Sequence, residues 1–201
     1  MKTVGFKKFG DPEVLEVMEF PDNEIGSEDI KIKNYASAVN PTDIVSRSGL
    51  IKHFIKDFSL PCVPGMDFAG IVEEVGENVK TGIKVGDSVM GMVMPNGIHG
   101  AYSDRLILNQ FAVVKIPKNT SFIEAATLPM NGLTARLSLD LLNLKKGQTI
   151  AVTGGPGAYG GYVIQLAKAD GLIVIADSNE SDLKLLKDLG ADHIIPRGKN
   201  F

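Results

Sequence analysis

The sequence contains few of the residues that mark disulfide-bonded or metal-binding proteins. Its 201 residues include a single cysteine, Cys62, so no internal disulfide can form. The three histidines, His53, His99 and His193, are scattered through different predicted elements. We expect each of them to be a surface or loop residue rather than a metal ligand. Cys62 is flanked by apolar residues and prolines, and we expect it to be a small packed hydrophobic residue.

Long apolar runs and a strong net charge are also missing. No uninterrupted apolar run reaches the roughly 18 residues that indicate a transmembrane helix. The first residues, "MKTVGFKKFG", have no apolar core of the kind found in secretory signals. The net charge is −3 with both signs mixed, which favours neither a nucleic-acid nor a membrane-surface partner. We therefore expect a protein of the reducing cytoplasm.

Most of the first two-thirds of the chain has the pattern of short β-strands. Runs such as "EVLEVMEF", "DIKIKNYASAVN", "FAGIVEEVG", "DSVMGMVM" and "DRLILNQFAVVKIP" lie between Gly, Pro, Asn and Asp residues. This spacing is typical of an all-β, barrel-like unit. One short helix is expected at "PTDIVSRSG", with Thr42 as its N-cap and Gly49 at its end.

The pattern changes near Ser121. The stretch "SFIEAATLPMNGLTARLSLDLLNL" has helical spacing, with Leu133, Leu137, Leu141 and Leu144 on one face. Next come a strand (149–153), a glycine-rich loop, a helix (about 159–170), a second strand (172–176), a second helix (about 180–189) and a third strand at "HIIP". This β-α-β-α-β order implies parallel strands with right-handed crossovers. We place the domain boundary between residues 122 and 123, with the long helix forming the junction.

The loop "TGGPGAYGG" contains the pattern G-x-G-x-x-G, from Gly155 through Gly157 to Gly160. One glycine allows a tight turn out of the strand, the second lets the backbone approach a pyrophosphate, and the third permits close packing of helix on strand. The N-terminus of the following helix offers N–H groups and a partial positive charge to phosphates. Because the pattern follows a strand and opens a helix, we interpret it as a dinucleotide-binding turn rather than a plain flexible turn.

The end of the second strand bears on the choice between NAD and NADP. The chain reads Asp177-Ser178-Asn179 there. An acidic residue would accept hydrogen bonds from the adenosine ribose, whereas a small polar residue or Arg would suit a 2′-phosphate. Asp177 therefore favours NAD, and Ser178 with Asn179 favours NADP. A third interpretation is that Asp177 or Ser178 only caps the next helix.

Several segments together resemble the medium-chain dehydrogenase/reductase superfamily, in its zinc-independent quinone oxidoreductase (zeta-crystallin-like) branch. They are "SAVNPTDIVSRSGL", "VPGMDFAGIVEEVGENV", "KVGDSVMG", "GAYSDRLIL", "AATLPMNGLTARLSL" and "GADHII". The resemblance implies a GroES-like β-barrel domain (residues 1–122) followed by the N-terminal half of a Rossmann domain (residues 123–201), with NAD(P)H bound between them. Because this family normally continues beyond such a point, we expect the chain to be the first part of a longer enzyme, a truncated form or a split product.

The resemblance also implies that zinc is absent. In zinc-dependent relatives a cysteine stands where this chain has Asn40, and a histidine stands where it has Met66. Neither an amide nor a neutral thioether replaces those ligands well, so we predict no catalytic zinc site. Four-cysteine structural zinc binding is excluded by the single cysteine.

The remaining roles are carried over from the resemblance. It places Asn40 near the nicotinamide ribose or substrate as the catalytic residue; the alternative is that Asn40 only hydrogen-bonds its own loop. Asp43 and Arg47 are interpreted as structural residues that hold the short helix. Tyr159 replaces the usual valine, so it would stack on the cofactor or crowd it, and Pro156 lacks one phosphate donor. The cofactor-binding residues are predicted to be Asn131, Thr134, Thr153, Gly155, Gly157, Ala158, Tyr159, Gly160, Asp177, Ser178 and Asn179.

The function implied by the resemblance is NAD(P)H-dependent reduction of quinones or α,β-unsaturated carbonyls, with NADP(H) favoured over NAD(H). Without a metal to polarise the substrate, an acceptor that is already electron-poor is the suitable one. We expect a homo-oligomer, a dimer, that acts on a small molecule, and we expect these 201 residues alone to be weakly active or inactive. The alternative is an inactive nucleotide-binding or assembly module that pairs with another chain.

Overall fold

The computed structural model describes residues 1–50 and 58–198, and His53 lies outside the described residues. The chain divides into two compact units, residues 1–129 and 130–201. The boundary expected from the sequence, between residues 122 and 123, falls within the short helix α2 (Phe122–Ala125), and that helix contacts strands of the first unit. Each unit is described separately below.

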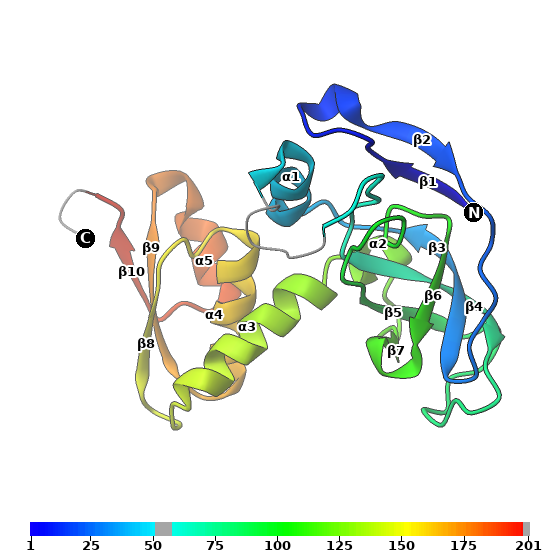
Figure 1. Cartoon of the computed structure of the whole chain (residues 1–201). Helices are drawn as coiled ribbons and strands as arrows, with labels where there is room; N and C mark the ends of the chain where they lie inside the picture. Colours follow the sequence, from blue (N-terminus) through cyan, green and yellow to red (C-terminus); the bar gives the residue numbers. More distant parts are fainter. Residues whose placement is uncertain (51–57, 199–201) are drawn as a thin grey trace. The chain divides into compact units, whose positions relative to one another are not determined.

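The first unit is built mainly from antiparallel strands (Figure 1). A five-stranded sheet has the order β6-β3-β4-β5-β7, and β1 pairs with β2 in a separate two-stranded sheet. The strands of this unit are β1 (Lys2–Gly5), β2 (Glu16–Glu19), β3 (Asp29–Ala36), β4 (Asp67–Val75), β5 (Ser88–Met92), β6 (Arg105–Asn109) and β7 (Val113–Lys115). Two short 3-10 helices accompany them, η1 (Pro12–Val14) and η3 (Gln110–Ala112).

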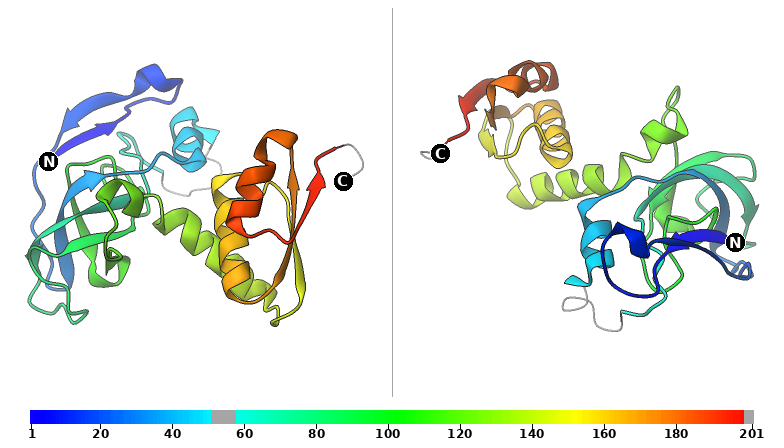
Figure 2. Two further views of the ribbon diagram at one scale, coloured as in Figure 1. Left: turned by 180° about the vertical axis from the view of Figure 1, so that it is seen from behind. Right: turned by 90° about the horizontal axis from the view of Figure 1, so that it is seen from above.

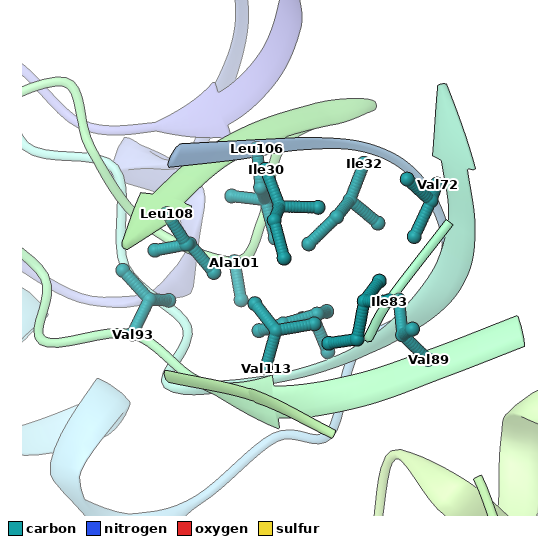
Figure 3. Packing of buried hydrophobic residues seen from close by; sticks show 11 residues of the cluster. Ile30, Ile32, Val72, Ile83, Val89, Val93, Ala101, Leu106, Leu108 and Val113 are labelled. Carbon is teal, nitrogen blue, oxygen red and sulfur yellow. The ribbon is translucent and has the colours of Figure 1, made fainter. Parts of the chain in front are cut away.

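Alternation along the strands forms the core of this unit. In β3, Ile30 and Ile32 are buried while Lys31 and Lys33 point away, as a period of two requires. Ile30 pairs with Leu108 of β6 across the sheet. Figure 3 shows these apolar side chains converging inside the curled sheet. The predicted barrel-like β-unit is therefore what the sequence forms.

The short helix α1 (Pro41–Ser48) begins two residues earlier than the sequence pattern suggested. Its N-cap is Asn40, with Pro41 at the first helical position, so the prediction of Thr42 as N-cap was wrong. Proline favours that first position because its missing N–H would be unpaired there anyway. The end at Gly49 is confirmed, because Gly49 has a φ of 84° and caps the helix in the left-handed conformation.

The stretch predicted as one long helix forms two helices. α2 is capped by Ser121, which exchanges hydrogen bonds with Glu124, and a second helix, α3 (Pro129–Leu142), follows. The leucine face predicted for this stretch is largely exposed: Leu133, Leu137 and Leu141 all face outward. The buried positions are instead Ala135 and Leu139, which belong to the core of the second unit.

The second unit has the predicted β-α-β-α-β order. A parallel sheet of order β10-β9-β8 has α4 and α5 side by side against it (Figure 2). The elements are β8 (Thr149–Val152), α4 (Ala158–Ala169), β9 (Ile173–Ser178), the 3-10 helix η4 (Glu180–Asp182), α5 (Leu183–Leu189) and β10 (His193–Pro196). Val174 of β9 and Ile164 of α4 are fully buried in the core between the sheet and these helices.

Within residues 1–50 and 58–198, no helix combines the length and apolar character that a membrane crossing requires. Cys62 is completely buried, as the sequence predicted, and its backbone exchanges two hydrogen bonds of 2.9 Å with Phe6. His193 is exposed in β10, whereas His99 is half-buried in a bridge with Asn96.

The burial of Cys62 has a measurable consequence for its reactivity. Burial raises the pKa of the Cys62 thiol from its ordinary 9.0 to about 11, and the nearby Asp43 carboxylate adds to the shift. The reactive thiolate is therefore suppressed below about pH 11 in the folded state. We expect iodoacetamide at pH 8.5 to modify native Cys62 at less than about 1% of the rate in denaturant. Equal rates in both states would contradict this burial.

Candidate functional site

The glycine turn of the second unit connects β8 to α4 through very close backbone packing. Gly154 takes the positive φ of the turn, 69°, one residue earlier than the G-x-G-x-x-G pattern alone places it. A Cβ on Gly160 would lie 2.4 Å from the Gly154 carbonyl oxygen, and a Cβ on Gly155 would lie 3.2 Å from Ala176 Cβ. No side chain fits at Gly160 because a Cβ would overlap the Gly154 backbone, whereas a Cβ at Gly155 would be tightly packed against neighbouring side chains, which would have to shift.

Gly157 differs from these two glycines because it borders open space. A Cβ there would meet only the Gly154 carbonyl oxygen, at 3.2 Å. Gly157 is the N-cap of α4, and Thr153, Ala158 and Tyr159 beside it are also exposed. A 12-residue helix presents unpaired N–H groups and a positive dipole end at this point. An exposed cradle of this kind fits a pyrophosphate.

Tyr159 connects this turn to α3. Its hydroxyl donates to Ser138 Oγ over 2.8 Å, and Ser138 in turn donates to the Thr134 carbonyl over 2.8 Å. Thr134 donates its own hydroxyl to the Met130 carbonyl, and Asn131 is half-buried one residue further on. The structure thus brings Tyr159 and Thr134 together through Ser138, which sequence analysis missed. The sequence signal that could have indicated this contact is Tyr159 itself, because a hydroxyl directly after the turn needs a hydrogen-bond partner.

Asp177 lies at the carboxyl end of β9 with its carboxylate almost fully buried. Asp177 Oδ1 accepts a 2.6 Å hydrogen bond from the Gly154 N–H, and Oδ2 accepts a 2.8 Å bond from Arg197 Nε. The Arg197 hydrogen bonds lower the pKa of Asp177; burial opposes them, and the N–H groups of Gly154 and Gly155 lower it further. This carboxylate therefore holds the glycine turn against β9. Sequence analysis missed Arg197, because 20 residues separate it from Asp177.

Ser178 and Asn179 lie in different environments. Ser178 is buried, and its hydroxyl donates to the Asn179 carbonyl over 2.6 Å. Asn179 is exposed and is the N-cap of η4, without a side-chain capping bond. The capping interpretation for Asp177 finds no support, because its carboxylate accepts hydrogen bonds from Gly154 of the glycine turn and from Arg197, which follows β10.

In the first unit, Asn40 lies in a buried polar cluster. Asn40 Nδ2 donates a 2.6 Å hydrogen bond to Asp67 Oδ2, and both side chains are at most 3% exposed. Asp67 belongs to the segment "GMDFAG", in which the sequence pattern alone indicated no role for it. A carboxylate that accepts from the amide fixes the amide nitrogen toward Asp67, so the direction of the Asn40 carbonyl oxygen is fixed as well.

Asp43 is the centre of this cluster. Its carboxylate accepts from the N–H groups of Asn40 and Gly65, at 2.8 and 3.0 Å, and from the Tyr102 hydroxyl at 3.2 Å. Burial, followed by the charge of Asp43, raises the pKa of the Tyr102 phenol, which stays protonated as a donor. Arg47 donates to the Gly10 carbonyl. These contacts agree with structural roles for Asp43 and Arg47.

A cavity of about 210 Å³ lies beside α1. Its lining is mostly apolar, and Thr42 donates its hydroxyl to Met66 Sδ over 3.4 Å. The lining residues are Thr42, Asp43, Ser46, Phe58, Met66, Met94 and Pro95. No cluster of three His, Cys, Asp or Glu side chains with metal-binding geometry occurs in the described part of the chain.

Comparison with known proteins agrees with both units. Residues 26–118 match the Alcohol dehydrogenase GroES-like domain family. The chain is 38% identical over its whole length to the 2-methylene-furan-3-one reductase of Solanum lycopersicum, and 34% identical over 96% of its length to the chloroplastic NADPH-dependent alkenal/one oxidoreductase of Arabidopsis thaliana. It covers 53% and 51% of those two proteins, so it spans about half the length of the curated relatives that it matches.

A solved structure gives the same assignment. Escherichia coli quinone oxidoreductase complexed with NADPH superposes with a TM-score of 0.81 at 30% identity, covering 97% of this chain and 58% of that one. A GroES-like domain followed by part of a Rossmann domain defines the medium-chain dehydrogenase/reductase superfamily, and the chain belongs to it. Within that superfamily it belongs to the quinone oxidoreductase (zeta-crystallin-like) branch.

The Asn40–Asp67 hydrogen bond can be tested by stability. We expect Asn40→Ala to lower the free energy of unfolding by about 1–3 kcal/mol, because Asp67 loses a buried donor. Asn40→Ser retains an N-cap oxygen for α1 but is too short to reach Asp67, so it should remain less stable than the wild type. Urea denaturation measures all three proteins. A serine variant as stable as the wild type would show that the Asp67 bond contributes nothing.

Two neighbouring glycines of α4 form a matched pair for testing the turn. Gly160→Ala forces a Cβ against the Gly154 backbone and should destabilise the protein by about 1–3 kcal/mol. In Gly161→Ala the new Cβ meets Leu189 Cδ1 at an ordinary 3.5 Å, so stability should be unchanged or raised by up to about 1 kcal/mol. The same urea measurement compares them. Equal effects in the two variants would contradict the close approach at Gly160.

Proposed function

We propose that this chain forms the GroES-like and adenosine-binding parts of a zinc-independent NADPH-dependent oxidoreductase that reduces quinones or α,β-unsaturated carbonyls. The observation that carries the proposal is the glycine turn. The close packing at Gly160 brings the N-terminus of α4 to an exposed cradle at Gly157. Backbone N–H groups and the helix dipole at that cradle suit the pyrophosphate of a dinucleotide.

The residues of the second unit divide between the two ends of the cofactor. Thr153, Gly155, Gly157, Ala158 and Gly160 hold the pyrophosphate. Asn131 and Thr134 of α3 serve the nicotinamide end. The Tyr159 hydroxyl donates a hydrogen bond to Ser138, and this bond fixes the tyrosine ring beside the cradle. The fixed ring limits the space that the cofactor can occupy there. When bound, NADPH supplies the hydride from C4 of its nicotinamide.

The first unit contributes the substrate side. Asn40, fixed by Asp67, presents its amide as a neutral hydrogen-bonding group for the substrate or the nicotinamide ribose. The mostly apolar cavity with Met66 and Phe58 suits a planar, electron-poor acceptor. Asn40 and Met66 are poor zinc ligands, so the acceptor must be activated by its own conjugation. One hydride and one proton from water convert an enone to a saturated carbonyl, or a quinone to a hydroquinone.

A specific observation favours the alternative of an assembly module. Leu133, Leu137 and Leu141 form an exposed apolar stripe along α3, and β8 and β10 are the outer strands of their three-stranded sheet. Such a surface suits pairing with another chain, including a second copy in a dimer. The two proposals differ in turnover. NADPH oxidation in the presence of a simple quinone supports the oxidoreductase, whereas an inactive chain that forms a stable dimer by light scattering supports the module.

Charge at the cradle tests the cofactor assignment. We expect Gly157→Asp to lower NADPH affinity by at least about 100-fold, because it places bulk and negative charge against the pyrophosphate. Gly157→Ala, which adds only a Cβ, should have a smaller effect. Fluorescence titration with NADPH measures both.

The matched control is Ala169→Asp, which adds the same charge at the far, exposed end of α4. It should leave the dissociation constant unchanged within about threefold. If Gly157→Asp bound NADPH with the affinity of the wild type, the cradle would not be the pyrophosphate site.

A further inference from the structure

Arg197 follows β10 directly and meets the end of β9. Its backbone N–H donates to the Ser178 carbonyl over 2.9 Å, continuing the parallel pairing of the two strands. The carboxyl ends of β9 and β10 therefore converge beside the glycine turn. In an open parallel sheet, this edge is where ligands bind.

The guanidinium of Arg197 is only partly used by the protein. Arg197 Nε donates to Asp177 Oδ2 at 2.8 Å, and Nη2 donates to Oδ1 at 3.2 Å. A guanidinium carries five N–H donors, so this paired contact leaves three of them. The Asp177 side chain is 5% exposed, whereas that of Arg197 is 42% exposed. The pair therefore presents its cationic partner to solvent and keeps the carboxylate inside.

This arrangement removes the usual ribose acceptor. A free carboxylate at the end of the second strand would accept a hydrogen bond from the 2′-hydroxyl of NAD and repel a 2′-phosphate. Here both oxygens of Asp177 already accept hydrogen bonds, from Arg197 and from the Gly154 N–H. Ser178 is also unavailable because it is buried and donates to Asn179. Among the described residues, Arg197 is then an exposed cationic group at this position, with the carboxylate of Asp182 close enough to interact with its charge.

We propose that Arg197 selects NADP(H) by binding the 2′-phosphate, while Asp177 acts as a positioning residue that aligns Arg197 with the glycine turn. This inference rests on the proposed function, because it assigns the selectivity of the same dinucleotide site. The buried carboxylate shared by Gly154 and Arg197 couples the two contacts. The glycine turn and the Arg197 guanidinium are therefore held by the two oxygens of one side chain.

The test compares two nucleotides that differ only in the 2′-phosphate: adenosine 2′,5′-bisphosphate and adenosine 5′-monophosphate. Their dissociation constants are measured by calorimetry on the full chain. The wild type should bind the bisphosphate at least about tenfold more tightly. Arg197→Gln should weaken bisphosphate binding about 10- to 100-fold and change monophosphate binding less than about threefold. Arg197→Lys retains the charge but not the paired donors, so its affinity for the bisphosphate should lie between those of the wild type and Arg197→Gln.

Two further variants make the result specific. Arg136→Gln is the matched control, because Arg136 in the same unit is also ion-paired, in its case with Asp140 and Asp170. It should change neither dissociation constant by more than about threefold. The double variant Asp177→Asn with Arg197→Gln removes both charges. If Arg197 binds the phosphate directly, this double variant stays about as weak for the bisphosphate as Arg197→Gln.

Each outcome has one interpretation. Recovery of bisphosphate affinity in the double variant would overturn direct binding, because it would show that Arg197 only cancels the charge of Asp177. Equal weakening of both nucleotides by Arg197→Gln, or no weakening, would overturn the inference while leaving the dinucleotide site intact. If the wild-type chain bound neither nucleotide, nor NADPH, the proposed function itself would fail. Thermal denaturation checks that every variant remains folded.

Discussion

Each unit depends on a buried carboxylate that must be satisfied by hydrogen bonds. A charge removed from water is tolerated only when donors surround it. In the first unit the Asp43 carboxylate accepts hydrogen bonds from two backbone N–H groups and a phenol, and these bonds connect the start of α1 to Gly65 and Tyr102. In the second unit the Asp177 carboxylate accepts hydrogen bonds from the Gly154 N–H and the Arg197 guanidinium, and these bonds connect the glycine turn to the sheet. The geometry of both candidate sites follows from these donors.

The same constraint explains how a polar residue is tolerated where zinc-dependent relatives have a ligand. Asn40 is buried beside the fully buried Asp67, and its amide supplies a donor that the carboxylate needs. The sulfur of Met66 accepts a hydrogen bond from the Thr42 hydroxyl. Every one of these contacts is made by a neutral group or a single carboxylate. Hydrogen bonds from neutral donors therefore position these side chains, which agrees with the proposal of a substrate side built from hydrogen bonds and apolar surface.

Local pattern predicted the elements well and their contacts poorly. The strand alternation around Ile30, the β-α-β order and the need for Gly160 all follow from periodicity or from one short motif. The N-cap at Asn40 was missed because both Asn40 and Thr42 can cap, and only the position of Pro41 distinguishes them. The roles of Asp67 and Arg197 were missed because each depends on a partner at least 20 residues away. The domain boundary, cofactor selectivity and catalytic role of Asn40 stay predictions.

The departure from the family pattern at Tyr159 is best understood together with Ser138. A valine at that position would leave the Ser138 hydroxyl without this donor, whereas tyrosine supplies one and connects α3 to the first turn of α4. The Ser138 hydroxyl in turn donates to the Thr134 carbonyl, so a chain of hydrogen bonds runs from Tyr159, beside the proposed pyrophosphate cradle, to the backbone of Thr134. Tyr159 and Asp177 therefore connect the same turn to two different elements. One orients it toward α3, and the other holds it to β9.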